Sequence, residues 1–117
     1  MRERRKLMRM QADLEAKYWA KGPSMSVGQA TVRDFSRDGL GLKLPDSVEK
    51  GEHVDLVLRI PGGSTVLATT EVAWSRELRS EPGVEVGLRF LSVNPLDLAR
   101  LSDFVCSRWL GGPGQGA

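Results

Sequence analysis

The chain has 117 residues, which is enough for one domain with a real core and too few for two. Apolar residues make up 40% of it and charged residues 27%, as in soluble globular proteins, and no apolar run is as long as a membrane span. No apolar stretch follows the N-terminal charges, so we expect no signal peptide. The single cysteine, Cys106, excludes an internal disulfide and fits a cytoplasmic protein, which is the location we expect.

Catalytic and metal-binding functions find no support in the composition. One histidine, His53, and one cysteine do not supply a zinc-ligand cluster or a Ser-His-Asp triad. No nucleophile–base pair and no paired acids stand in a plausible register. We therefore expect a protein that is not an enzyme and that carries no metal and no cofactor.

The net charge of +2 is unevenly distributed. Residues 1–9 carry five basic side chains and one acidic one, a net charge of +4, whereas the remainder carries 12 basic and 14 acidic side chains, a net charge of −2. A basic arm ahead of a mildly acidic body indicates a polyanionic or phosphate-bearing partner. A solvated tail that aids solubility explains the charge alone equally well.

Most of the chain alternates apolar and polar residues with a period of two, which is typical of half-buried strands. The alternating apolar sets are, in chain order, Leu14, Ala16 and Tyr18; Leu40, Leu42 and Leu44; Val54, Leu56, Leu58 and Ile60; Val66, Ala68, Thr70, Val72 and Trp74; and Val84, Val86, Leu88 and Phe90. Strands near 12–19 and 29–35 are less regular, and Asp38-Gly39 is a hairpin signal. About six closely spaced strands favour a closed or nearly closed antiparallel barrel, which removes exposed sheet edges.

The pattern changes to helical spacing after Ser92. Asn94 is a good N-cap and Pro95 fits the first helical position, which predicts a helix over 95–110. Its apolar face, formed by Leu98, Leu101, Val105 and Trp109, is expected to cover one end of the barrel. The expected organisation is a basic arm over 1–10, a barrel over 11–92, a helical segment over 93–110 and a flexible tail over 111–117.

The remaining conspicuous residues are expected to be structural. Trp74 and Trp109 lie on apolar stripes and are assigned to the core, with a partner surface as the alternative for Trp109. His53 is expected on the surface, and Cys106 as a small packing residue. Gly87 is assigned to packing within its strand.

Two short motifs carry most of the functional information. The first is an RxxxR spacing, Arg5 to Arg9, within the basic arm, and the second is DxSxxG, Asp34 to Gly39, at the end of an expected strand. Arginine makes bidentate contacts with guanine, stacks on purines and binds phosphate. An aspartate accepts hydrogen bonds from guanine N1–H and N2–H₂, a donor pair that adenine lacks. Ser36 offers a hydroxyl, and Gly39 allows close backbone approach with its N–H free for the ligand.

In this order, and followed by an all-β pattern, the two motifs resemble the PilZ family of bacterial cyclic di-GMP receptors over residues 4–90. The string 87–90, Gly-Leu-Arg-Phe, is similar to a late-strand GxxF pattern of that family. The resemblance implies an all-β fold, a six-stranded antiparallel PilZ-type β-barrel with a C-terminal α-helix. It also implies a non-catalytic signalling adaptor that binds cyclic di-GMP, as one molecule or as an intercalated pair, and acts on an unidentified downstream protein.

The resemblance also implies roles for individual residues. The ligand-binding residues that it implies are Arg4, Arg5, Arg9, Asp34, Ser36 and Gly39. The two motif arginines would clamp guanine and phosphate, the arginine before them would be an accessory phosphate contact, and the other three residues would form the facing edge of the barrel.

Two other functions fit parts of the sequence. A small nucleic-acid-binding β-barrel could use the basic arm on phosphates, but the acidic body and the lack of clustered exposed aromatic residues argue against it. A PilZ-like interaction module without a ligand is the second alternative. The complete set of motif residues argues against that one.

Overall fold

The structure, a computed structural model, describes residues 10–21 and 26–110, apart from the side chains of residues 109 and 110. The expected tail over 111–117 and the core assignment of Trp109 therefore lie outside the described residues.

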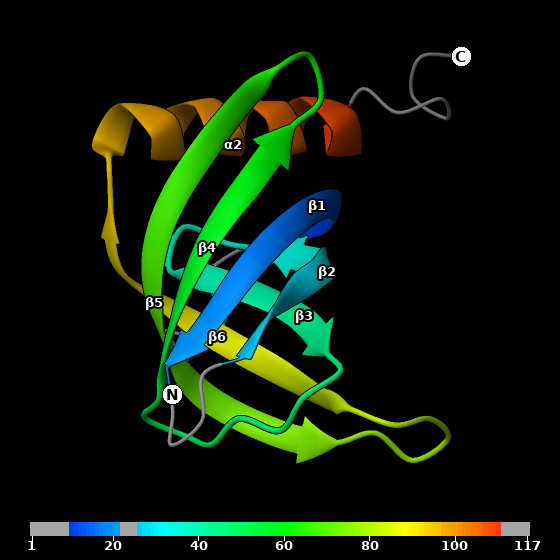
Figure 1. The fold of residues 1–117 in the computed structure, drawn as a ribbon. Coiled ribbons are helices and arrows are strands. Elements are labelled where there is room, and N and C mark those ends of the chain that lie inside the picture. The colour runs from blue at the N-terminus through cyan, green and yellow to red at the C-terminus, as the bar shows by residue number, and fades with distance from the viewer. Residues whose placement is uncertain (1–9, 22–25, 111–117) are drawn as a thin grey trace, which may run out of the picture.

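Six strands close into a single antiparallel barrel, and one helix follows them (Figure 1). The elements are β1 (Met10–Lys21), β2 (Ser26–Phe35), β3 (Gly39–Leu44), β4 (His53–Ile60), β5 (Ser64–Glu77), β6 (Val84–Val93) and α2 (Pro95–Leu110). The order around the barrel is β1-β2-β3-β6-β5-β4, and every neighbouring pair is antiparallel. The all-β fold expected from the sequence, with its C-terminal helix, is confirmed.

The interior of the barrel is filled by the alternating apolar side chains. The inward-facing residues that are nearly inaccessible to solvent include Leu14, Tyr18, Val32, Phe35, Leu42, Val54, Leu58, Val66 and Val86. Thr70 is a polar residue of this interior, and its hydroxyl donates a hydrogen bond of 2.7 Å to the carbonyl of Val54. The buried hydroxyl is therefore satisfied, so its burial carries no large penalty.

Helix α2 begins as its sequence predicts and lies across one end of the barrel (Figure 1). The Asn94 side-chain oxygen accepts hydrogen bonds from the backbone N–H groups of Leu96 (2.8 Å) and Asp97 (3.4 Å), which caps the first turn. Leu101 and Val105 are buried against the barrel core. Within residues 10–21 and 26–110, no helix combines the length and apolar character that crossing a membrane requires.

Tyr18 anchors the loop between β3 and β4 from inside the barrel. Its hydroxyl donates to Asp46 Oδ2 at 3.0 Å, and the Ser26 hydroxyl donates to the same oxygen at 3.0 Å. Burial, reinforced by the hydrogen bond to the Asp46 carboxylate, raises the pKa of the Tyr18 phenol above its ordinary value.

Candidate ligand-binding site

Asp34 lies on the outer face of the barrel because β2 contains a bulge. Val32 faces the interior, so strict alternation would also turn Asp34 inward. The register of β2 with β3 shifts between Val32, which pairs with Leu42, and Asp34, which pairs with Gly41. Arg33 is the extra residue, and the shift moves Asp34 to the outer face.

The start of β1 lies beside Asp34. In the β1–β2 ladder Met10 pairs with Phe35, and Gln11 pairs with Asp34. The basic residues of the first motif precede Met10 directly in the chain. The fold therefore joins the N-terminal arm to the barrel at the second motif, although the two motifs are about two dozen residues apart. Arg4, Arg5 and Arg9 themselves lie outside the described residues.

The second motif closes a tight hairpin turn between β2 and β3. The Ser36 N–H donates to the Gly39 carbonyl (2.9 Å), and the Gly39 N–H donates to the Ser36 carbonyl (3.2 Å). The Ser36 hydroxyl accepts a hydrogen bond from the Asp38 N–H at 3.3 Å, and Ser36 is only 2% exposed. The expectation that the Gly39 N–H is free for a ligand is wrong, because that group holds the turn closed.

Gly39 is required by packing and not by its own backbone conformation. Its φ is not positive, whereas a β-carbon at this position would lie 1.8 Å from the carbonyl oxygen of Leu88 on β6. The Phe90 N–H also donates to the Asp38 carbonyl at 2.8 Å, which holds the turn against β6. Ser36 and Gly39 thus fix the turn that carries the motif.

Trp74 lies on the outer face, and its assignment to the core is wrong. The register of β5 with β6 shifts between Val72 and Trp74, so that Trp74 pairs with Gly87 and its side chain leaves the inward stripe. Trp74 is 42% exposed. A β-carbon on Gly87 would lie 2.2 Å from the indole nitrogen, so the indole covers this glycine. The packing role expected for Gly87 is thereby explained.

Asp34 and Trp74 stand at the two ends of one row of paired residues. The row crosses four strands, Asp34 on β2, Gly41 on β3, Gly87 on β6 and Trp74 on β5. The Asp34 carboxylate lies over Gly41 as the indole lies over Gly87, so both side chains reach toward the middle of the row. A hydrogen-bond acceptor and an aromatic ring therefore share one small patch.

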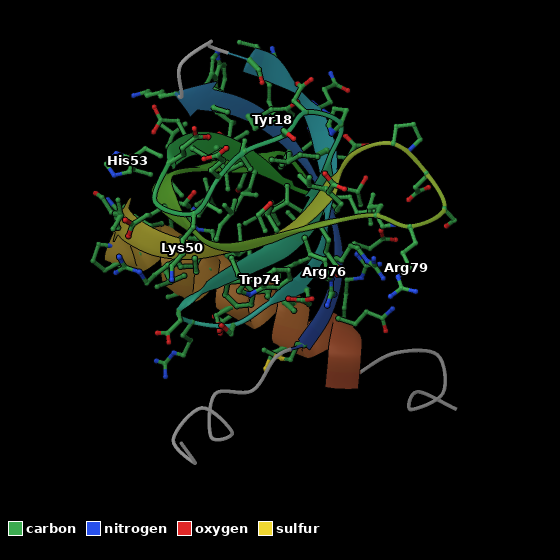
Figure 2. The ribbon with its side chains drawn as sticks, turned by 90° about the horizontal axis from the view of Figure 1, so that it is seen from below. Tyr18, Lys50, His53, Trp74, Arg76 and Arg79 are labelled. Carbon is green, nitrogen blue, oxygen red and sulfur yellow. The ribbon has the colours of Figure 1, made fainter. Side chains whose placement is uncertain are left out.

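Cations beside this row are paired with carboxylates. Arg76 lies 5.5 Å from the centre of the Trp74 ring, and Figure 2 shows both side chains near each other on the outer surface. Arg76 also donates to Glu85 at 2.7 Å, and this hydrogen bond is the main cause that lowers the pKa of the Glu85 carboxyl. Arg89, opposite Gly39, is paired with Glu71.

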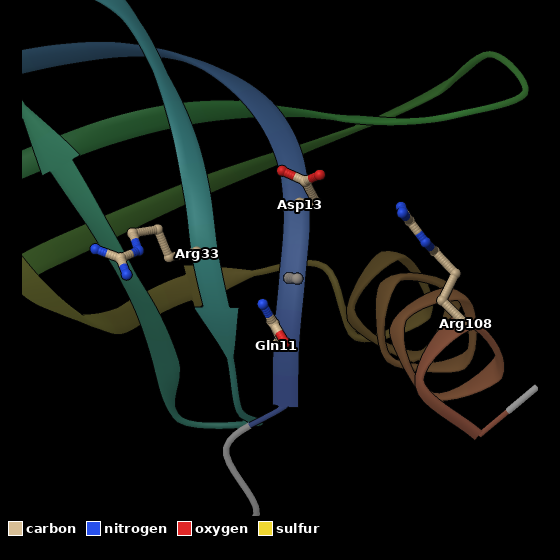
Figure 3. A pocket seen from close by; sticks show the side chains of 5 residues that line it. Gln11, Asp13, Arg33 and Arg108 are labelled. Carbon is tan, nitrogen blue, oxygen red and sulfur yellow. The ribbon is translucent and has the colours of Figure 1, made fainter. Parts of the chain in front are cut away.

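An open pocket of about 440 Å³ adjoins the row on the side of β1. It is lined by Gln11, Ala12 and Asp13 of β1, Arg33 of β2 and Arg108 of α2. Figure 3 shows Arg33 and Arg108 on opposite sides of the beginning of β1. The pocket is continuous with the motif through Arg33, the bulge residue next to Asp34.

Comparison with known proteins gives a family and a fold. The sequence pattern of the PilZ domain family matches residues 3–106 of this chain. No curated protein sequence matches.

Three solved structures share the fold at low identity. The Bacillus subtilis inhibitor of motility MotI/DgrA has a TM-score of 0.75 and 17% identity; the match covers 92% of this chain but only 52% of MotI/DgrA, so this chain spans about half its length. The PilZ domain of YcgR from Escherichia coli, solved with c-di-GMP, has a TM-score of 0.68 and 18% identity, with 89% and 90% covered. The PilZ domain of CeSA from a cellulose-synthesizing bacterium has a TM-score of 0.56 and 14% identity, with 86% and 96% covered.

Proposed function

The chain belongs to the PilZ domain family, and on that premise we propose that it is a non-catalytic, cytoplasmic receptor for cyclic di-GMP. The observation that carries the proposal is the meeting of the two motifs: the β1–β2 register sets Gln11 opposite Asp34, so the arginine-rich arm joins the barrel beside the aspartate. The YcgR domain solved with c-di-GMP has the same fold, which supports this ligand class.

Asp34 is the guanine-selective residue in this proposal. Its carboxylate is half-buried on the outer face, where the bulge in β2 holds it over Gly41. It accepts hydrogen bonds from guanine N1–H and N2–H₂. Adenine has no matching pair of donors, so a cyclic dinucleotide with adenine would leave polar groups without partners on both sides.

The arginines of the arm bind the rest of the ligand. Arg5 and Arg9 clamp guanine and phosphate with planar, bidentate contacts, and Arg4 adds a phosphate contact. The arm, with its net charge of +4, supplies positive charge for a dianionic ligand. Ser36 and Gly39 act through the turn that they close, which fixes the position of the strand carrying Asp34.

Trp74 adds a stacking surface that the sequence motifs do not include. Its indole lies in the same cross-strand row as Asp34 and is 42% exposed. A purine that hydrogen-bonds to Asp34 through its edge can stack on this ring with its face. Stacking and edge recognition together select a flat, guanine-containing ligand.

Ligand binding draws residues 1–9 onto the barrel face, because their arginines and Asp34 contact the same molecule. The surface that a downstream protein meets then changes with the concentration of the second messenger. This coupling is the signalling step of the proposed function.

Calorimetric titration of the full chain tests the ligand class. Cyclic di-GMP should bind, whereas GTP, cyclic di-AMP and short oligonucleotides should bind weakly or not at all. Tight oligonucleotide binding that falls steeply with salt, with no heat from cyclic di-GMP, would favour the nucleic-acid function instead.

A further inference from the structure

Glu85 of β6 lies among cations from three other strands. Its Oε1 accepts a hydrogen bond from Arg76 of β5 at 2.7 Å, and the Arg33 guanidinium of β2 lies 4.0 Å from its Oε2. Lys43 of β3 pairs with Glu85 across the strands. The hydrogen bond from Arg76, helped by the nearby charges of Arg33 and Lys43, lowers the pKa of this carboxyl. One carboxylate therefore draws together side chains that repel one another.

This cation cluster, Arg33, Lys43 and Arg76 around Glu85, lies directly beside the cross-strand row of the candidate site. Lys43 is two residues after Gly41 on β3. Glu85 is two residues before Gly87 on β6. Alternate residues of a strand share a face and are about 7 Å apart. A ligand whose guanine meets the row can therefore place a phosphate, joined to that guanine through a sugar, at the cation cluster.

The two arginines of the cluster are accessible to a ligand. The Arg76 side chain is 68% exposed and lies 5.5 Å from the centre of the Trp74 ring (Figure 2). The Arg33 side chain is 52% exposed, and that of Glu85 is 27% exposed. Both guanidinium groups can thus contact a ligand without unpacking the barrel.

We propose that the cation cluster binds a phosphate of the ligand, and that the Glu85 carboxylate occupies it in the free protein as an internal competitor. Carboxylate and phosphate groups both offer arginine a pair of acceptor oxygens. The incoming phosphate takes over the hydrogen bond from Arg76, and Glu85 turns away because the two anions repel each other. The proposal rests on the proposed function and deepens it: Arg76 joins the ligand-binding residues, and Glu85 sets how tightly the ligand binds.

The competitor separates affinity from base selectivity. The arginines give up contacts with Glu85 when they bind phosphate, so the net gain in free energy is smaller than for unpaired arginines. Cyclic di-GMP and cyclic di-AMP carry the same phosphates and meet the same competition. Glu85 therefore lowers the affinity for both ligands and leaves the guanine preference to Asp34.

The test is the affinity of full-length variants for cyclic di-GMP, measured by calorimetry after thermal unfolding has shown that each variant folds. Glu85→Gln should strengthen binding about twofold to fivefold, because it keeps the size of the side chain and removes the competing charge of an exposed pair. Arg76→Ala should weaken binding about tenfold, since it removes a charge-assisted contact. A general loss of structure cannot produce opposite shifts of this kind.

Asp55→Asn is the matched control for net charge. Asp55 is paired with Lys21 at 2.9 Å and lies on β4, which contributes to neither the row nor the cation cluster. This variant removes one negative charge, as Glu85→Gln does, but should stay within about twofold of the wild type. Equal strengthening by both variants would overturn the proposal, as would unchanged or weaker binding by Glu85→Gln or wild-type affinity in Arg76→Ala. Each of these results, with cyclic di-GMP bound, leaves the proposed function intact.

Inorganic phosphate separates this proposal from the ligand class. Titrated against chloride at constant ionic strength, it should shift the NMR signals of the Arg76 side chain and the Trp74 indole N–H. The shifts should appear at lower phosphate concentration in Glu85→Gln than in the wild type. If cyclic di-GMP does not bind at all, this titration decides: shifts that depend on Glu85 in this way support an anion site with an internal competitor, and their absence overturns it.

Discussion

The carboxylate of Asp34 lies directly over Gly41, so close that a β-carbon on Gly41 would be 2.7 Å from Asp34 Oδ1. The two residues pair across β2 and β3 on the outer face of the barrel. A glycine in a strand often marks the close approach of another group, and here that group is the side chain proposed to recognise guanine.

Gly41→Ala should therefore weaken cyclic di-GMP binding about tenfold without unfolding the barrel. The new methyl group meets a side chain that can rotate away, which moves the carboxylate from its position but costs the fold little. Calorimetry and thermal unfolding measure the two effects separately.

Gly39→Ala is the contrasting control for that variant. Its β-carbon would meet the backbone carbonyl of Leu88 at 1.8 Å, and backbone cannot move aside as a side chain can. This variant should lower the melting temperature clearly. Equal melting temperatures for the two variants, or normal ligand affinity for Gly41→Ala, would contradict the account of Gly41.

Trp74→Ala should weaken cyclic di-GMP binding about fivefold to a hundredfold, because stacking of a base on an aromatic side chain contributes about 1–3 kcal/mol. Trp74→Phe should recover part of the affinity, since it restores an aromatic face. Trp19→Ala is the control, a half-buried tryptophan near the far end of β1 from the motif. Ligand affinity that responds to Trp19 and not to Trp74 would rule out the stacking role.

The double variant Arg5→Ala/Arg9→Ala should abolish measurable cyclic di-GMP binding. Each arginine is proposed to make charge-assisted contacts worth roughly 1.5–3 kcal/mol. Limited trypsin digestion gives an independent readout, because ligand should slow cleavage after Arg4 in variants that bind and not in the double variant. Wild-type affinity in the double variant would show that the arm does not contribute to the ligand site.

Alkaline pH should destabilise the fold through Tyr18. The pKa of this phenol is raised in the folded state above its ordinary value of 10.0, so the folded protein holds the proton more tightly than the unfolded chain does. The resulting stability is fully present below about pH 10 and is lost as the pH rises through the folded pKa. Tyr18→Phe should show a smaller loss of unfolding free energy above pH 10 in urea titrations. Parallel pH profiles for the two proteins would contradict this role.

The sequence predicts the barrel well because most strands alternate strictly. Val54 to Ile60 is an example: every second residue is buried, as the pattern requires. The cap at Asn94 and the buried face of α2 at Leu101 and Val105 were also predictable, since local hydrogen bonding and helical spacing determine them.

The two bulges could not be predicted from the alternating pattern, and they determine which side chains form the candidate site. One inserted residue in β5 turns Trp74 outward, and one in β2 turns Asp34 outward. The available signal was the pair of strand glycines, Gly41 and Gly87, which mark positions where another group approaches the backbone. The open pocket lined by Arg33 of β2 and Arg108 of α2 had no sequence signal, because tertiary packing alone places α2 beside β1.

The most direct test of the account is the discrimination between cyclic di-GMP and cyclic di-AMP by the wild type and by Asp34→Ala, measured by calorimetry. The wild type should prefer cyclic di-GMP by about a hundredfold or more, because the mismatched base leaves unpaired polar groups that cost about 1–3 kcal/mol each. Asp34→Ala should keep the wild-type fold, bind cyclic di-GMP much more weakly and lose most of the discrimination. A folded Asp34→Ala protein that still binds cyclic di-GMP with wild-type affinity and selectivity would contradict the account.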